Sequence, residues 1–305
     1  MGAYLLARLG QSVLAIASVL VLAFFMVRLT GDPAVVMLPQ EATAADVAAF
    51  RSAMGFNRPL NVQFWEFVRH AAVRDFGKSL QYRTSARVLI MERLPATMEL
   101  AIASLAFAVA VAVPLGTLAA TRPASVWDGL AQAVALLGQA LPAYWVGLIL
   151  IIVLSVHLHL LPVAGRSGWL SLIMPMVTMA MGLLGRLTAL SRSVMLEALR
   201  QDYIRTALSK GLGRLAVHYR HALKNAAIPL LTVVGVNFGY LLGGSVLIES
   251  VFAWPGIGRL AALAVFQRDF PLVQAVAFFS SLIVITVNLA TDLLYGALNP
   301  LVRYR

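Results

Sequence analysis

Six long stretches without a charged side chain divide the sequence, and each of them is mostly apolar. A transmembrane helix needs about 20 consecutive apolar residues to cross about 30 Å of hydrocarbon, so each stretch is long enough for one crossing. The stretches run over 9–27, 100–121, 129–165, 167–185, 225–248 and 270–291. The pattern therefore predicts an all-α membrane protein with about six transmembrane helices.

The third stretch, 129–165, is the longest. Once the polar stretch His157 to His159 and the pair Leu161-Pro162 are excluded, the remainder is too short for two spans and a turn. We therefore expect a single span there. The spans after the first are expected near 100–121, 133–156, 168–190, 227–248 and 270–291.

The first stretch has an alternative interpretation, because Arg8 precedes an apolar run as in a secretory signal peptide. The apolar part of a signal peptide is usually about 7–15 residues long and ends at a small-residue cleavage site. This run is longer and leads into Met26, Val27 and Arg28. We therefore expect residues 1–30 to form a cytoplasmic end and a retained first span.

Composition indicates the same class of protein. Hydrophobic residues make up 60% of the 305 residues and charged residues 12%, and the mean hydropathy is +0.84. Such a chain has too little polar surface for a soluble globule of this length. The sequence contains no cysteine, which excludes disulfides and thiolate metal sites.

Lysine and arginine in short loops set the orientation of a membrane protein, whereas long segments cross regardless of charge. Twelve lie in the N-terminus and in 122–128, 186–224 and 292–305, and three lie in 157–166 and 249–269. The long segment 28–99 is left out of this comparison. Both termini are therefore predicted to be cytoplasmic, with the tail formed by 295–305.

The formal net charge of +11 raises the question of nucleic-acid binding. In a membrane protein, an excess of basic residues is explained by cytoplasmic loops that face anionic lipid. We therefore expect the lipid bilayer, and no nucleic acid, as a partner.

The segment 31–93 differs from the rest of the chain. It combines turn-forming residues such as Gly31-Asp32-Pro33 with charges and several aromatic residues. Its apolar residues fit short amphipathic helices, and a disordered linker rarely carries so many aromatics. These residues are Phe50, Met54, Phe64, Phe67, Val68 and Ala71. We expect a small folded extracytoplasmic domain between the first two spans.

The segment 193–226 is polar and strongly basic, and apolar residues recur in it at helical spacing. Gly211 and Gly213 interrupt this periodicity, which predicts a pair of helices with a sharp reversal between them. A basic helix with a narrow apolar stripe can rest on anionic lipid or dock into another protein. Composition alone favours the lipid surface.

Catalytic signatures are missing from the sequence. It has no zinc motif of the His-Glu-x-x-His type and no glycine-rich loop ending in Gly-Lys-Ser or Gly-Lys-Thr. Ser245 follows two glycines, but no histidine comes after residue 221 to act as its base, so we expect these glycines to pack helices closely. Arg186, Glu249 and Asp292 stand at the ends of charge-free stretches, where interfacial water can solvate them. A proton-coupled transporter or channel normally needs such a group at mid-membrane.

Several segments resemble permeases of type I ABC importers of the dipeptide, oligopeptide and nickel group. The strongest resemblance is Gln201 to Leu230, QDYIRTALSKGLGRLAVHYRHALKNAAIPL. The other matching segments, in family order, are Leu29 to Pro33 (LTGDP), Met54 to Leu60 (MGFNRPL), Asp75 to Ser79 (DFGKS), Glu92 to Leu100 (ERLPATMEL), Glu249 to Gly258 (ESVFAWPGIG) and Leu298 to Tyr304 (LNPLVRY).

This resemblance implies a transmembrane core over 94–294 and a set of partners. The partners are a second, homologous permease, two ABC ATPase subunits that bind ATP and Mg, and an extracytoplasmic substrate-binding protein. The chain itself is then not an enzyme and holds no metal or cofactor. It would lie in a bacterial inner membrane and translocate a small solute, with a di- or oligopeptide or a glutathione-like peptide as the expected cargo.

The same resemblance implies that the basic segment docks on the ATPase subunits and not on lipid. The expected interface consists of Arg205, Ala207, Lys210, Gly211, Gly213, Arg214, His218 and Arg220. The general permease pattern begins with Glu-Ala-Ala, whereas this chain has Arg205-Thr206-Ala207. No salt bridge can therefore be transferred from the glutamate version.

Overall fold

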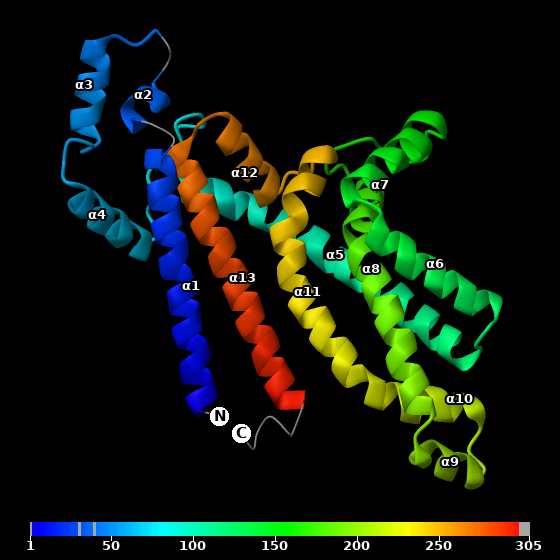
Figure 1. Cartoon of the computed structure of the whole chain (residues 1–305). Coiled ribbons are helices and arrows are strands. Elements are labelled where there is room, and N and C mark those ends of the chain that lie inside the picture. Colours follow the sequence, from blue (N-terminus) through cyan, green and yellow to red (C-terminus); the bar gives the residue numbers. More distant parts are fainter. Residues whose placement is uncertain (1, 30–31, 39–40, 299–305) are drawn as a thin grey trace. The chain divides into compact units, whose positions relative to one another are not determined.

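The structure, a computed structural model, describes residues 2–29, 32–38 and 41–298. Within these ranges every element is helical, apart from one isolated antiparallel bridge between Lys78 and Ser85. The chain forms two compact units, Met1–Thr97 with Pro255–Thr286 and Met98–Trp254 with Val287–Arg305. Figure 1 shows the helices in chain order.

The first unit contains the N-terminal helices and, from the end of the chain, one short and one long helix. They are α1 (Gly2–Leu29), α2 (Pro33–Met37), α3 (Ala44–Ala53), α4 (Leu60–Ala72), the start of α5 (Ala86–Thr121), α12 (Ile257–Phe266) and α13 (Phe270–Leu298) as far as Thr286.

The second unit contains the central helices, two of which end in π-helical turns. They are the rest of α5, α6 (Val126–Ala140), α7 (Ala143–Leu150), η1 (Ile151–His157), α8 (Trp169–Leu199), α9 (Asp202–Ser209), α10 (Arg214–Ala216), η2 (Val217–Ala222), α11 (Leu223–Val251) and the end of α13.

The number of candidate spans agrees with the sequence prediction. Among the described residues, five helices are long and apolar enough to cross a membrane, and a bent helix pair supplies the sixth candidate. The five lie in α1, α5, α8, α13 and the continuous helix that runs from α10 into α11. The apolar helix α12 has only ten residues and was not predicted as a separate element.

The third span is not the single helix expected over 133–156. It consists of α6 and the α7–η1 helix, which meet at an angle of 106°. The break falls at Leu141, which is extended, and at Pro142, which has no backbone N–H to donate and disfavours helical geometry in the residue before it.

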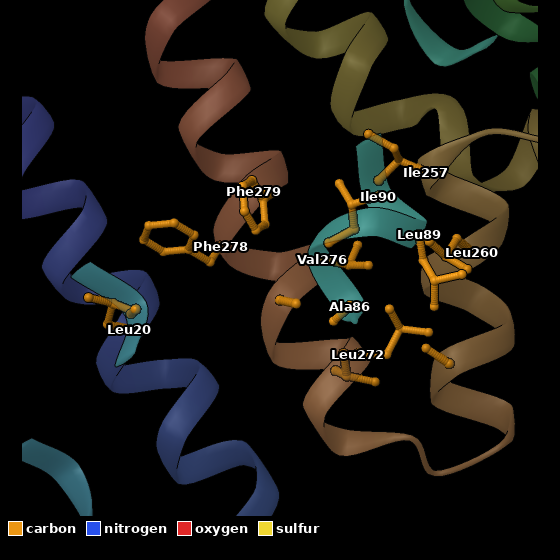
Figure 2. Packing of buried hydrophobic residues seen from close by; sticks show 14 residues of the cluster. Leu20, Ala86, Leu89, Ile90, Ile257, Leu260, Leu272, Val276, Phe278 and Phe279 are labelled. Atoms are coloured by element: carbon orange, nitrogen blue, oxygen red, sulfur yellow. The ribbon is translucent and has the colours of Figure 1, made fainter. Parts of the chain in front are cut away.

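A hydrophobic core joins the two ends of the sequence within the first unit. Figure 2 shows Ile90 of α5, Ile257 of α12 and Leu272 of α13 packed together, and each of these side chains is almost fully buried. Removing such side chains from water is the main favourable contribution to folding. The core therefore depends on residues almost 200 positions apart.

The segment 31–93 folds into short helices, as predicted. Helix α3 begins with a capping box in which Thr43 and Asp46 exchange hydrogen bonds. Phe67 of α4 lies 5.9 Å from Phe24 of α1 and 6.0 Å from Phe76, measured between ring centroids. Phe76 in turn lies 5.1 Å from Phe278. The segment is therefore part of a larger unit with α1, α12 and α13, and not the separate domain that the sequence suggested.

Glycine allows α6 and α8 to approach closely in the second unit. A Cβ atom added to Gly138 would lie 2.7 Å from the carbonyl oxygen of Met181 and 3.0 Å from Cα of Gly185. Both are backbone atoms, which cannot move aside as a flexible side chain can. This contact holds the first half of the bent span against α8.

The ends of the chain are only partly described. Helix α13 continues to Leu298, so the first residues of the predicted tail 295–305 extend the last span. Residues 299–305, and with them most of the motif from 298 to 304, lie outside the described residues.

Candidate functional site

Within the predicted segment 193–226, residues 201–222 lie between α8 and α11 and form the basic segment, which contains one separate helix and not two. Helix α9 is the separate one. The second expected helix consists of α10 and η2, which continue without a break into α11. When α10 and η2 move, the adjoining end of the span formed by α11 therefore moves with them.

A Schellman motif ends α9 and reverses the chain. The N–H of Gly211 donates to the carbonyl of Leu208 at 2.9 Å, and the N–H of Leu212 donates to the carbonyl of Ala207 at 3.3 Å. Gly211 has a φ of +79°, a conformation that residues with a Cβ atom rarely adopt. Gly213 has a φ of −61°, which suits any residue. The sequence prediction that glycine is needed is thus correct for Gly211 and wrong for Gly213.

A buried cluster attaches α9 to three spans. Ile204 and Ala207 of α9 pack with Val217, with Met195 of α8 and with Ala120 at the end of α5. All five side chains are at most 7% exposed. Close-packed interiors deform little, so α9 and the ends of α5, α8 and α11 are held together as one body.

Most of the predicted interface residues are accessible. Arg205, Lys210, Gly211, Gly213, Arg214 and Arg220 are exposed, and His218 is half-buried. Ala207 is not available for an interface, because it is buried in the cluster just described. Its small side chain allows the close packing of α9.

Exposed apolar side chains accompany these charges, and they were missing from the predicted interface. They are Tyr203, Leu208, Leu212, Leu215 and Tyr219, with Leu215 the most exposed at 74%. On α9 the structure buries Ile204 and Ala207 and leaves Tyr203 outside. A mixed apolar and basic surface of this kind is typical of protein interfaces.

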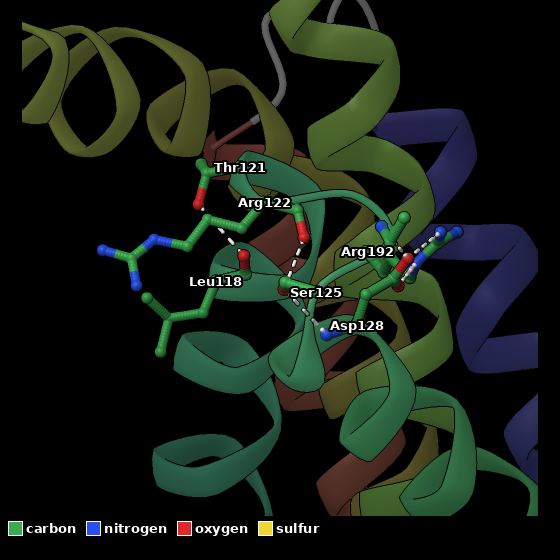
Figure 3. A network of polar contacts seen from close by, with 7 residues as sticks. Leu118, Thr121, Arg122, Ser125, Asp128 and Arg192 are labelled. Carbon is green, nitrogen blue, oxygen red and sulfur yellow. Dashed lines mark hydrogen bonds and ion pairs between the residues drawn. The ribbon is translucent and has the colours of Figure 1, made fainter.

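An ion pair holds the loop between α5 and α6 against α8. Arg192 donates to Asp128 through Nε at 2.5 Å and through Nη2 at 3.1 Å. Asp128 also accepts from the N–H of Ala124 at 3.0 Å. Figure 3 shows this pair together with Ser125, which donates to the carbonyl of Arg122. The loop is thereby fixed to the helix that carries α9.

A second arginine of α8, Arg186, makes a hydrogen bond to α11. Nη2 of Arg186 donates to Oδ1 of Asn237 at 2.7 Å, and Nδ2 of Asn237 donates to the carbonyl of Val233 at 2.7 Å. Asn237 lies near the middle of the charge-free stretch 225–248 of α11, 12 residues from its first residue and 11 from its last. At 1.5 Å rise per residue, these distances are about 16–18 Å, so the guanidinium of Arg186 contacts α11 near the middle of this stretch.

Two further expectations about the spans are wrong. The side chain of Glu249 is fully buried in the protein and is not solvated at the membrane interface. Gly243, expected to pack against another helix, has no neighbouring atom within 4 Å, whereas a Cβ on Gly239 would lie 2.7 Å from Oδ1 of Asn288. The side chain of Asp292 lies outside the described residues.

These features define a class of protein, namely a multi-span membrane permease whose core helices carry a closely packed basic segment. The family model of the binding-protein-dependent transport system inner membrane component matches residues 112–304, and the model of the N-terminal part of such membrane components matches residues 1–101. The chain belongs to this family and is a permease subunit of a type I ABC importer in the inner membrane.

Relatives of known name match along the full length. The chain is 38% identical over 303 residues to the glutathione transport system permease protein GsiC of Salmonella typhimurium (strain LT2), with 99% of both chains covered. It is 38% identical over 290 residues to GsiC of Escherichia coli (strain K12), covering 95% of this chain and 94% of the relative.

A solved structure shares the fold. It is a chain of the MetNI methionine ABC transporter in an inward-facing crystal form, with a TM-score of 0.58 and 16% identity. The match covers 69% of this chain and 96% of the other.

Proposed function

We propose that this permease imports a small peptide, with glutathione as the first candidate, when an extracytoplasmic binding protein delivers it. The full-length similarity to glutathione permeases supports this cargo. The assembled transporter has two permease subunits, this chain and a homologous partner, and the cargo passes between them. Both termini and the basic segment lie in the cytoplasm, as the distribution of lysine and arginine indicates.

Two ATPase subunits drive the cycle, and they bind the ATP and Mg that this chain does not hold. The observation that carries this proposal is the rigid attachment of α9 to the ends of α5, α8 and α11. When ATP closes the ATPase dimer, a displacement of α9 moves the three spans with it. The cargo site then changes from inward-open to outward-open, and hydrolysis resets it.

The first test is uptake of labelled glutathione into proteoliposomes that contain the complete transporter, with binding protein outside and ATP inside. We expect accumulation that requires ATP and the binding protein. Uptake that persists without ATP and collapses with the proton gradient would contradict the proposal. A labelled dipeptide in the same vesicles tests the cargo separately from the energy source.

The second test is docking of the ATPase subunits. Leu215→Asp places a carboxylate on the most exposed apolar residue of the basic segment, so we expect co-purification of the ATPase to fall by about tenfold or more. Val73→Asp, at a site of similar exposure (67%) in the extracytoplasmic segment, is the control and should leave co-purification unchanged. Equal loss in both variants would indicate a general folding defect.

A further inference from the structure

The exposed side chains of α8 form a single stripe along its inner half. After its first two residues, the only exposed positions of this fully described helix are Arg186, Ala189, Ser193 and Glu197. Their spacing of three or four residues places them on one helix face. We call these four residues the α8 stripe.

The α8 stripe does not have the composition of a lipid-facing surface. It contains no large apolar side chain, whereas helix α1 exposes Val13, Leu14 and Leu22, each by 66% or more. Lipid contact requires apolar side chains, as on α1. The stripe of α8 instead suits water or the partner permease.

Arg186 carries a positive charge in this stripe. A charge inside the membrane is tolerated only where it faces a protein interior or a water-filled cavity and finds polar partners. Its neighbour Asn237 is almost fully buried, and the amide nitrogen of Asn237 is occupied by the carbonyl of Val233. Asn237 therefore orients the guanidinium but accepts only one of its five N–H donors.

The remaining N–H donors of Arg186 have no carboxylate partner among the described residues, where the ion pair of α8 is made by Arg192. A guanidinium fork matches the two oxygens of a carboxylate. Tyr240, one helical turn beyond Asn237 and 72% exposed, adds a hydroxyl on the neighbouring face of α11. Among the described residues, Arg186 is thus a cation with unpaired donors on an uncovered, small-residue surface of α8.

We propose that the α8 stripe lines a water-accessible path and that Arg186, held by Asn237, binds the carboxylate of a solute in transit. This inference rests on the proposed function, because it needs a path beside α8. It predicts that the transported solutes carry a free carboxylate, and it gives Asn237 the role of positioning Arg186.

The absence of cysteine from the sequence allows a direct test. Ala189→Cys and Ser193→Cys are introduced singly, and the transporter is assembled with its partner subunits in inside-out vesicles. Each variant is treated with carboxyethyl or trimethylammonium-ethyl methanethiosulfonate, and labelling is read on this chain. Rates are divided by those for free 2-mercaptoethanol, which removes the intrinsic difference between the reagents.

Both reagents should react at Ala189→Cys, and the carboxylate reagent should have the higher normalised rate. A unit charge about 8 Å away in a water-filled path favours the anion over the cation by about fivefold, and by more at lower dielectric. Arg186→Gln should bring the ratio close to one, whereas Arg186→Lys should preserve it. Asn237→Ala should reduce the ratio by releasing the guanidinium. Leu22→Cys on α1 is the lipid-facing control and should not react.

Two results would overturn the inference. Protection of both stripe cysteines in a complex that transports would show that protein covers the stripe, and a reagent ratio unaffected by Arg186→Gln would show that no anion site exists. Failure of the proposed function appears differently, as an assembled wild-type complex without ATP-driven uptake. The labelling rates remain measurable in that case, so the two failures are distinguishable.

Discussion

The conformation of Gly211 provides the sharpest test of the coupling model. Gly211→Ala places a Cβ atom on a residue with a φ of +79°, although no atom lies within 4 Å of the new methyl group. The change therefore acts through backbone strain and not through a clash. Left-handed geometry costs an L-residue about 1–2 kcal/mol.

This strain should weaken the closed turn of α9 by a definite factor. A cost of about 1–2 kcal/mol corresponds to a factor of about 5–30 in a conformational equilibrium. Gly213→Ala is the matched control, because it adds the same methyl group two residues away, also in open space, at a φ of −61°. It should change the equilibrium by much less.

Amide hydrogen exchange of the peptides covering 201–212 measures this opening. We expect exchange to become about 5–30 times faster in Gly211→Ala and to change little in Gly213→Ala. ATPase activity stimulated by cargo and binding protein should fall in the first variant only. Equal exchange in the two variants would refute the role of the turn, and fast exchange with full stimulation would refute α9 as the transmitting element.

Three further changes test contacts within each of the two units. Gly138→Ala should destabilise the protein by about 1–3 kcal/mol, because its methyl group meets the backbone of α8. The control Gly129→Ala lies on the same helix but in open space and should be neutral or stabilising, as thermal unfolding of the purified protein would show. Arg192→Met should lower the unfolding temperature more than Arg192→Met combined with Asp128→Leu, because the single change leaves a buried carboxylate without its cation; an equal loss would argue against the ion pair. Asp269→Ala removes a buried carboxylate that accepts from Ser79 and from the N–H groups of Gln81 and Leu272; it should cost about 1–3 kcal/mol and speed proteolysis near 79–85, and unchanged cleavage would contradict this anchoring role.

The pattern of charges and apolar residues was sufficient to determine much of this protein. It predicted a helical membrane protein with six candidate spans, because the thickness of the bilayer fixes the length of an apolar helix. It also located the basic segment and the glycine of its turn. These are local properties, which depend on neighbouring residues and on the surrounding solvent.

The same pattern could not decide which side of a helix is covered. On α9, packing against α8 and η2 buries Ile204 and leaves its neighbour Tyr203 exposed. Helical spacing defines stripes, but contacts between distant segments select among them.

The position of Arg186 also depended on contacts between distant segments. Along the sequence it ends a charge-free stretch, which suggested the membrane interface. Its hydrogen bond to Asn237, 51 residues later, places the guanidinium at the middle of α11. The sequence by itself determined which segments enter the membrane, because burial in lipid depends on the length of each apolar run. Only the tertiary structure decided which polar groups meet there, because that depends on how α8 and α11 pack.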